Sequence, residues 1–149
     1  MILAIVSIVL MLLPMLTINA YEFGYSNRLS FSGFEMASGM TLSDGSELSR
    51  NFFAWLMVMV PIFSVLTNYI KKLFSLKKIM LFVAPLICTV CLFLAKSTAA
   101  SSLKVSLSTS IGFWLYLLAC LFWLVVGYLQ YKNLPLNKES ISKIINQKK

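Results

Sequence analysis

The chain contains no histidine and few charged residues. Only 12% of its 149 residues are Asp, Glu, Lys or Arg, and only five of these are acidic. The absence of histidine excludes imidazole acid–base catalysis and metal ligation by imidazole. The sequence also has no glycine-rich phosphate loop, no GxSxG serine and no nucleic-acid-binding motif. We therefore expect a protein that is not an enzyme and that binds no cofactor, metal ion or nucleic acid.

Cysteine is scarce as well. Cys88, Cys91 and Cys120 all lie inside apolar runs, and the loops between those runs contain none. The spacing of Cys88 and Cys91 is that of redox or zinc pairs, but neither histidine nor a neighbouring cation is available to stabilise a thiolate. We expect these three residues to serve as small apolar packing residues, and we exclude disulfide bonds in the loops.

Long apolar runs account for most of the composition. Each run is long enough to cross a hydrocarbon layer of about 30 Å as a helix, and none contains a charged residue. The sequence predicts an all-α membrane protein, a four-transmembrane-helix bundle formed by a single domain over residues 1–149. The predicted spans are Met1–Asn19, Phe52–Ile70, Ile79–Ala95 and Ile111–Tyr131.

The first run has a second interpretation, as a cleaved signal peptide that ends at "INA" before Tyr21. No positive residue precedes the run, and it is longer than the apolar region of a usual signal peptide. We favour a retained span. Pro14 falls inside it, as Pro61 and Pro85 do in the next two runs, and membrane helices tolerate such prolines.

Lysine and arginine are unevenly distributed. Nine of the thirteen lie between the second and third runs or after the fourth. Because positive residues remain cytoplasmic, we expect a multi-pass protein of a bacterial plasma (inner) membrane with both termini in the cytoplasm. The inner loop is expected to contact anionic lipid of the inner leaflet through Lys71, Lys72, Lys77 and Lys78.

Alternation of apolar and polar residues predicts strands in both outer loops. Tyr21–Phe31 alternates around Ser26 and Asn27, which predicts a β-hairpin, and Ser102–Ser108 alternates in the second outer loop. We expect a small extracytoplasmic antiparallel β cap built from both loops. Because the first outer loop, residues 20–51, is too long for a simple connection, a folded segment is expected there.

The stretch "FSGFEMASGM" follows the predicted hairpin. Two glycines can supply turns around a short helical turn that presses apolar side chains onto the spans. Glu35 is expected to face water or to take a backbone or arginine partner. We consider this stretch a cap that can bind a partner, through Phe31, Phe34, Glu35, Met36 and Met40.

The last apolar run carries a stripe of small and aromatic residues at intervals of four, three, four and four, on one helix face. Small residues allow helix backbones to approach closely in a membrane, so we expect this face to pack against the other helices. The stripe consists of Gly112, Tyr116, Ala119, Trp123 and Gly127.

The layout resembles that of the claudin-like membrane proteins in topology: four spans, inward termini, a long first outer loop with strands and a short second outer loop that adds another. The claudin loop signature is absent, because the first outer loop contains neither Trp nor Cys. "SGFEMASG" is also similar to loops of small uncharacterised bacterial four-span proteins. The resemblance implies a four-helix bundle with a β cap.

The expected function is binding of membrane lipid and of another membrane or envelope protein, as an accessory subunit or an immunity-type protector. The alternative is an oligomeric channel, or a conduit for lipid or an apolar solute. A conduit is expected to show a polar stripe through the spans, and none is visible. Self-assembly into a homo-oligomer is left open.

Overall fold

The computed structural model of the protein describes residues 2–18, 29–41, 47–69, 74–103 and 107–131. These residues are mostly helical, with two small antiparallel sheets. In chain order the elements are α1 (Ile2–Leu10), β1 (Pro14–Ile18), β2 (Leu29–Ser32), α2 (Gly33–Ser38), β3 (Met40–Thr41), β4 (Glu47–Leu48), α3 (Phe52–Tyr69), α4 (Phe74–Leu103), β5 (Leu107–Thr109) and α5 (Ile111–Tyr131).

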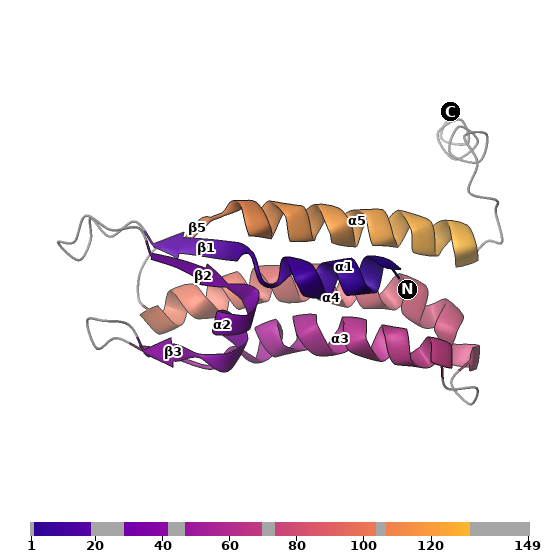
Figure 1. Ribbon diagram of the computed structural model, residues 1–149, viewed down its shortest axis with the longest axis horizontal. Helices are drawn as coiled ribbons and strands as arrows, with labels where there is room; N and C mark the ends of the chain where they lie inside the picture. The colour runs from indigo at the N-terminus through magenta and orange to yellow at the C-terminus, as the bar shows by residue number, and fades with distance from the viewer. Residues whose placement is uncertain (1, 19–28, 42–46, 70–73, 104–106, 132–149) are drawn as a thin grey trace.

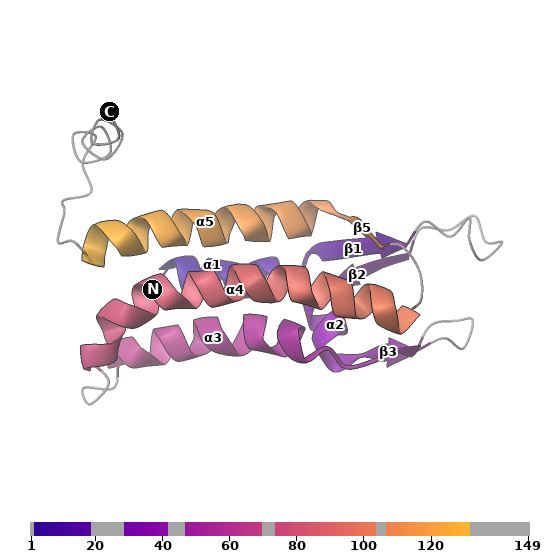
Figure 2. The ribbon, with the colours of Figure 1, turned by 180° about the vertical axis from the view of Figure 1, so that it is seen from behind.

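The helices lie side by side along the long axis of the molecule (Figure 1). The strands and α2 gather at one end, which we call the sheet end; the end of α3, the start of α4 and the end of α5 lie at the other, the helix end. Helix α4 covers one face and packs on α3 and α5 (Figure 2). On the opposite face α1 contacts the same two helices.

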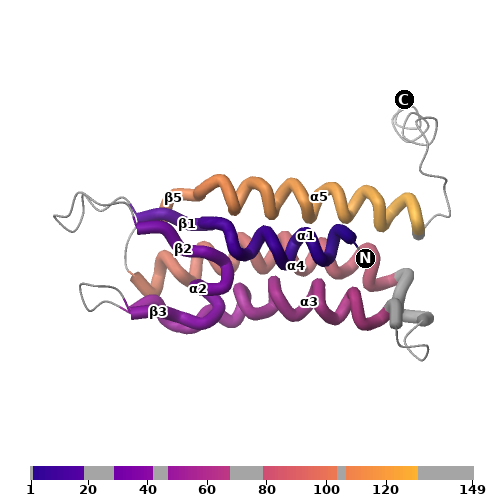
Figure 3. Tube along the Cα trace, viewed as in Figure 1, coloured from indigo at the N-terminus to yellow at the C-terminus, as the bar shows by residue number. Residues whose placement is uncertain are grey.

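The prediction of one helix over Met1–Asn19 is wrong. Helix α1 ends at Leu10, and a turn whose amides bond to carbonyls three residues earlier leads into β1 at Pro14. Figure 3 traces α1 directly into β1. The carboxyl-terminal part of this apolar run is therefore a strand, and Pro14 lies in that strand rather than in a helix.

Strand β1 is the centre of a three-stranded antiparallel sheet in the order β2-β1-β5. Leu16 pairs with Phe31 on one side and with Thr109 on the other. Both of the predicted outer loops contribute a strand, so the predicted small antiparallel sheet is confirmed, but the two strands do not pair with each other. A central strand covered on both sides is often a continuous apolar run, which is why this segment looked like part of a span.

Two details of the strand prediction differ in the structure. In the segment Ser102–Ser108, the first two residues belong to α4, residues 104–106 lie outside the described residues, and β5 covers Leu107–Thr109. The first arm of the predicted hairpin and its turn lie outside the described residues, and β2 takes β1 as its partner.

The long helices agree more closely with prediction. Helix α5 has the predicted bounds, α3 begins at the predicted Phe52, and α4 is longer than Ile79–Ala95 at both ends. Two helical stretches, Ile79–Leu103 and Ile111–Gln130, are long and apolar enough to cross a membrane. Helix α3 holds a shorter apolar stretch, and α1 has nine residues, so a bundle of four spans is not established.

Candidate functional site

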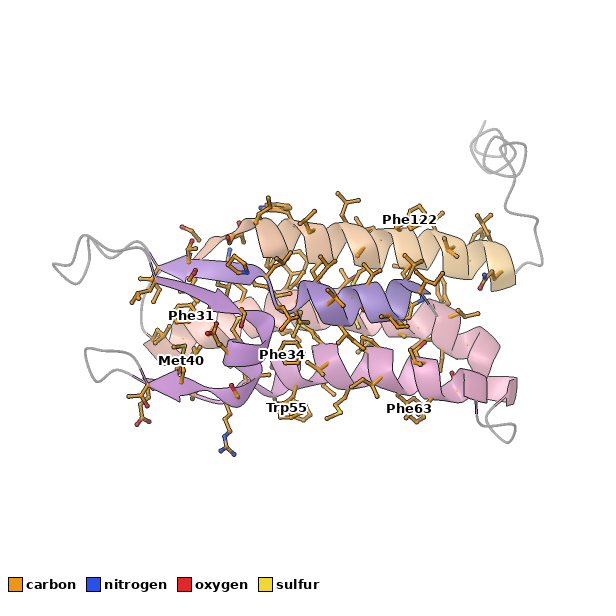
Figure 4. All side chains as sticks on the ribbon, in the orientation of Figure 1. Phe31, Phe34, Met40, Trp55, Phe63 and Phe122 are labelled. Atoms are coloured by element: carbon orange, nitrogen blue, oxygen red, sulfur yellow. The ribbon has the colours of Figure 1, made fainter. Side chains whose placement is uncertain are left out.

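The predicted cap residues lie where β2, α2 and β3 meet the start of α3 (Figure 4). Phe31 is 2% exposed and Met36 is 1% exposed, and both belong to the main apolar core. The structure therefore corrects their assignment to a partner surface, because their side chains are already occupied by intramolecular packing. Phe34 and Met40 are half-buried and pack against the same core.

Helix α2 forms as the sequence predicts, and Glu35 has a structural partner. Its carboxylate accepts hydrogen bonds from the Ser32 amide (2.7 Å) and the Ser32 hydroxyl (2.8 Å), while the Glu35 amide donates to Ser32 Oγ. This capping box satisfies amides that the helix itself leaves unpaired. Glu35 therefore caps the start of α2, which agrees with the expected backbone partner.

A turn at Gly39 connects α2 to the β3–β4 pair. Gly39 has φ = 76°, a conformation that side-chain-bearing residues rarely adopt, and its amide donates to the Glu35 carbonyl. A Cβ at this position would lie 2.8 Å from the Leu48 carbonyl oxygen. The glycine therefore allows β4 to approach the end of α2.

Next to this turn the structure has an open hollow of about 320 Å³ at the sheet end. Its rim is rich in hydroxyls and carries one carboxylate and one guanidinium. The lining residues are Ser38, Gly39, Met40, Thr41, Glu47, Leu48, Ser49 and Arg50. The sequence did not predict this feature, because β3 and β4 are only two residues long and show no alternation of apolar and polar residues.

The hollow is fixed to the helices by hydrogen bonds that follow β4. Ser49 is bonded to the Ser102 hydroxyl of α4 (2.9 Å). Asn51, 2% exposed, donates from Nδ2 to the Ala95 carbonyl (2.8 Å), and its Oδ1 accepts from the Phe53 and Ala54 amides at the start of α3. One amide side chain thus caps α3 and joins it to α4.

The predicted packing stripe lies along the inner side of α5. Gly112, Tyr116, Trp123 and Gly127 are buried and Ala119 is half-buried. A Cβ at Gly112 would lie 2.5 Å from the Pro14 carbonyl oxygen, and one at Gly127 would collide with the Leu81 carbonyl oxygen. The two glycines therefore permit close approach to β1 and to α4, and the Tyr116 hydroxyl donates to the Met57 carbonyl of α3 (3.2 Å).

The chemistry available inside the helices is limited. Cys88, Cys91 and Cys120 are free and buried. Among the residues that the structure describes, no group of three or more His, Cys, Asp or Glu side chains could hold a metal ion.

The lysines of the predicted inner loop can be located only in part. The backbones of Lys77 and Lys78 lie in the first turns of α4, at the helix end, whereas Lys71 and Lys72 lie outside the described residues.

Comparison with known proteins yields no relative: neither a protein family, nor a curated protein, nor a solved structure matches the chain. The topological resemblance to claudin-like proteins therefore has no support from sequence or structural similarity.

Proposed function

We propose that the protein is a small multi-pass membrane protein whose sheet end projects from the bilayer and binds a membrane or envelope partner. In this role it acts as an accessory subunit or as an immunity-type protector rather than as an enzyme.

The observation that carries the proposal is the apolar surface of the helices. Within the described part of the chain, every exposed large hydrophobic side chain except those of Leu12 and Leu29 lies on α1, α3, α4 or α5. Only 33% of the residues in the most apolar window of α4, and of α5, are buried, whereas the core helix of a soluble protein is mostly buried. Exposed apolar surface on this scale favours a lipid surrounding. Figure 4 shows Trp55, Phe63 and Phe122 on the outer sides of their helices.

The charges that the structure describes lie elsewhere. Glu35, Glu47, Arg50 and Lys96 belong to the sheet end or to the part of α4 that adjoins it. In the sequence, the lysine-rich segment follows α3 and the C-terminal segment follows α5, and both of these helices end at the helix end. The positive-inside rule therefore supports a cytoplasmic helix end and an external sheet end.

The hollow beside β3 and β4 is the proposed contact surface. It is the polar, open region described above, and hydrogen bonds from Ser49 and Asn51 hold it in a fixed position on α4. A preformed surface loses little conformational entropy on binding, which favours a specific partner.

Membrane topology can be tested by single-cysteine labelling, because the native thiols are buried. Cysteine is introduced at exposed Ser38 of α2 or at exposed Gln130 near the end of α5. We expect a membrane-impermeant maleimide to label Ser38→Cys in intact cells and Gln130→Cys only after permeabilisation. Labelling of both from the same side, or a compact protein soluble without detergent, would refute membrane insertion with this topology.

Partner binding is tested separately with a photo-crosslinking residue at Thr41, inside the hollow, and at Ser97, exposed on α4 but outside the lining. We expect one discrete heterologous adduct from position 41 and none from position 97. No adduct from either position, or an adduct of twice the chain mass, would contradict the partner proposal; the latter would favour a homo-oligomer.

A further inference from the structure

Helix α4 is longer than a membrane requires. Its 30 residues extend about 45 Å, whereas a hydrocarbon core is about 30 Å thick, so at least one end projects from it. Lys78 and Lys96 are 18 residues apart, about 27 Å along the axis, and residues 79–95 between them carry no charge. This interval matches the hydrocarbon thickness.

The character of α4 changes at Lys96. Ser97, Thr98 and Ser101, which follow it, are exposed, and the hydroxyls of Thr98 and Ser101 donate to carbonyls of their own helix. Before Lys96 the exposed residues include Phe93 and Leu94. In the orientation proposed above, Lys96 therefore lies at the level of the phospholipid headgroups on the sheet side.

The Lys96 ammonium lies over an aromatic cluster shared by α4 and α5. Its distance to the centroid of the buried Phe113 ring is 5.9 Å, within the range of a cation–π contact. Phe113 makes edge-to-face contacts with Phe93 (5.7 Å) and Trp114 (5.8 Å). Phe93 is 51% exposed and Trp114 is 57% exposed, so the cluster presents two aromatic rings beside a half-buried cation.

This cation has no counter-ion among the described side chains. No carboxylate there forms an ion pair with Lys96, and Glu35 is engaged by Ser32. An ammonium held over an aromatic ring and without a carboxylate partner among the described residues favours an external anion. At this depth the available anion is a lipid phosphate.

We propose that Lys96, Phe93 and Trp114 form a binding site for an anionic phospholipid in the sheet-side leaflet. The ammonium donates to the headgroup phosphate, while the two exposed rings pack against the glycerol region and the upper acyl chains. This inference rests on the proposed membrane insertion. It adds a lipid site at the end opposite to the inner-loop lysines, where the sequence alone offered only an isolated lysine.

The test measures quenching of Trp114 by brominated lipids in vesicles. The full chain carries Trp55→Phe, so that Trp114 and the buried Trp123 remain, and the same chain with Trp114→Phe gives the Trp123 background. Vesicles of phosphatidylcholine contain an equal fraction of either brominated phosphatidylglycerol or brominated phosphatidylcholine. We expect an apparent preference for phosphatidylglycerol of about fivefold, equivalent to about 1 kcal/mol for one lysine at an anionic surface.

Substitution of Lys96 distinguishes loss of the lipid site from loss of membrane insertion. Lys96→Gln is expected to abolish the preference while quenching by brominated phosphatidylcholine persists, and Lys96→Arg is expected to retain it. Lys78→Gln is the matched control: it removes a cation at the other end of α4, about 27 Å from Lys96 and in the opposite leaflet, so it should not change the preference that Trp114 reports. Equal quenching by both lipids in the unsubstituted site, or a preference that survives Lys96→Gln, would overturn the lipid site alone. No quenching by either lipid would overturn membrane insertion as well.

Discussion

The sheet end and the helices satisfy most of their polar side chains in different ways. At the sheet end, hydrogen bonds connect separate elements: Asn51 joins α3 to α4, and Ser49 joins the segment after β4 to α4. In the helices, Ser7, Thr67 and Thr89 donate to carbonyls three or four residues earlier in their own helix, and the bond from Tyr116 to the Met57 carbonyl of α3 is an exception.

This contrast indicates which interactions hold each region together. Side chains bonded within their own helix leave packing between helices to apolar surfaces and close backbone approach, as at Gly127 and Leu81. Directional bonds between elements position short strands that are too small to be stable alone. The following substitutions test this division, with unfolding in detergent followed by the reactivity of the three buried thiols.

We expect the largest effect where a side chain would enter a neighbouring backbone. Gly127→Ala introduces a Cβ against the Leu81 carbonyl, and Gly112→Ala introduces one 2.5 Å from the Pro14 carbonyl oxygen. Since a backbone atom cannot rotate away, each should cost about 3 kcal/mol, at the upper end of overpacking effects. The measurement is the free energy of unfolding. Leu118→Ala on the exposed side of α5 is the control and should cost much less; equal costs would refute the close-approach argument.

Removal of the link between α3 and α4 should have the next largest effect. Asn51→Ala removes the bond to the Ala95 carbonyl and the acceptor for the Phe53 and Ala54 amides. We expect destabilisation of about 2–3 kcal/mol, the sum of a lost N-cap and a lost buried hydrogen bond. Asn51→Ser keeps a capping oxygen without the Nδ2 donor, and should recover about half of the loss in the same unfolding measurement. No difference between the two variants would contradict the dual role.

Disruption of the capping box should have a moderate effect. Glu35→Ala leaves the Ser32 amide without its carboxylate acceptor, which should cost about 1 kcal/mol. Glu47→Ala changes an exposed carboxylate on β4 and should leave the unfolding free energy unchanged within about 0.5 kcal/mol. A larger loss of unfolding free energy for Glu47→Ala than for Glu35→Ala would mean that the stability of α2 does not depend on its capping box.

The smallest effect is expected inside α3. Thr67→Val keeps the side-chain shape and removes only the bond from the Thr67 hydroxyl to the Ser64 carbonyl of the same helix (2.8 Å). The unfolding free energy should change by no more than about 0.5 kcal/mol, because such local bonds add little to helix stability. A loss of unfolding free energy comparable to that of Asn51→Ala would contradict the distinction between the sheet end and the helices.

Several elements were predictable because local chemistry decides them. Helix α5 is a long apolar run without proline, and α2 is preceded by Ser32, which is followed three residues later by Glu35. The stripe on α5 followed from helical periodicity alone. The hollow was not predictable from the residues on its rim, because Thr41 and Arg50 belong to separate segments that only the β3–β4 pairing brings together.

The sequence by itself determined the apolar helices, the short capped helix and the segregation of charge, since periodicity, capping residues and lysine positions act over a few residues. Only tertiary contacts determined the conformation of the first apolar run. Pro14 begins a strand while Pro61 and Pro85 lie within helices, although all three have apolar neighbours. The difference is that β1 has two strands to pair with: β2, the next strand in the chain, and β5, which lies far away in the sequence, so no pattern within the run itself could reveal the strand.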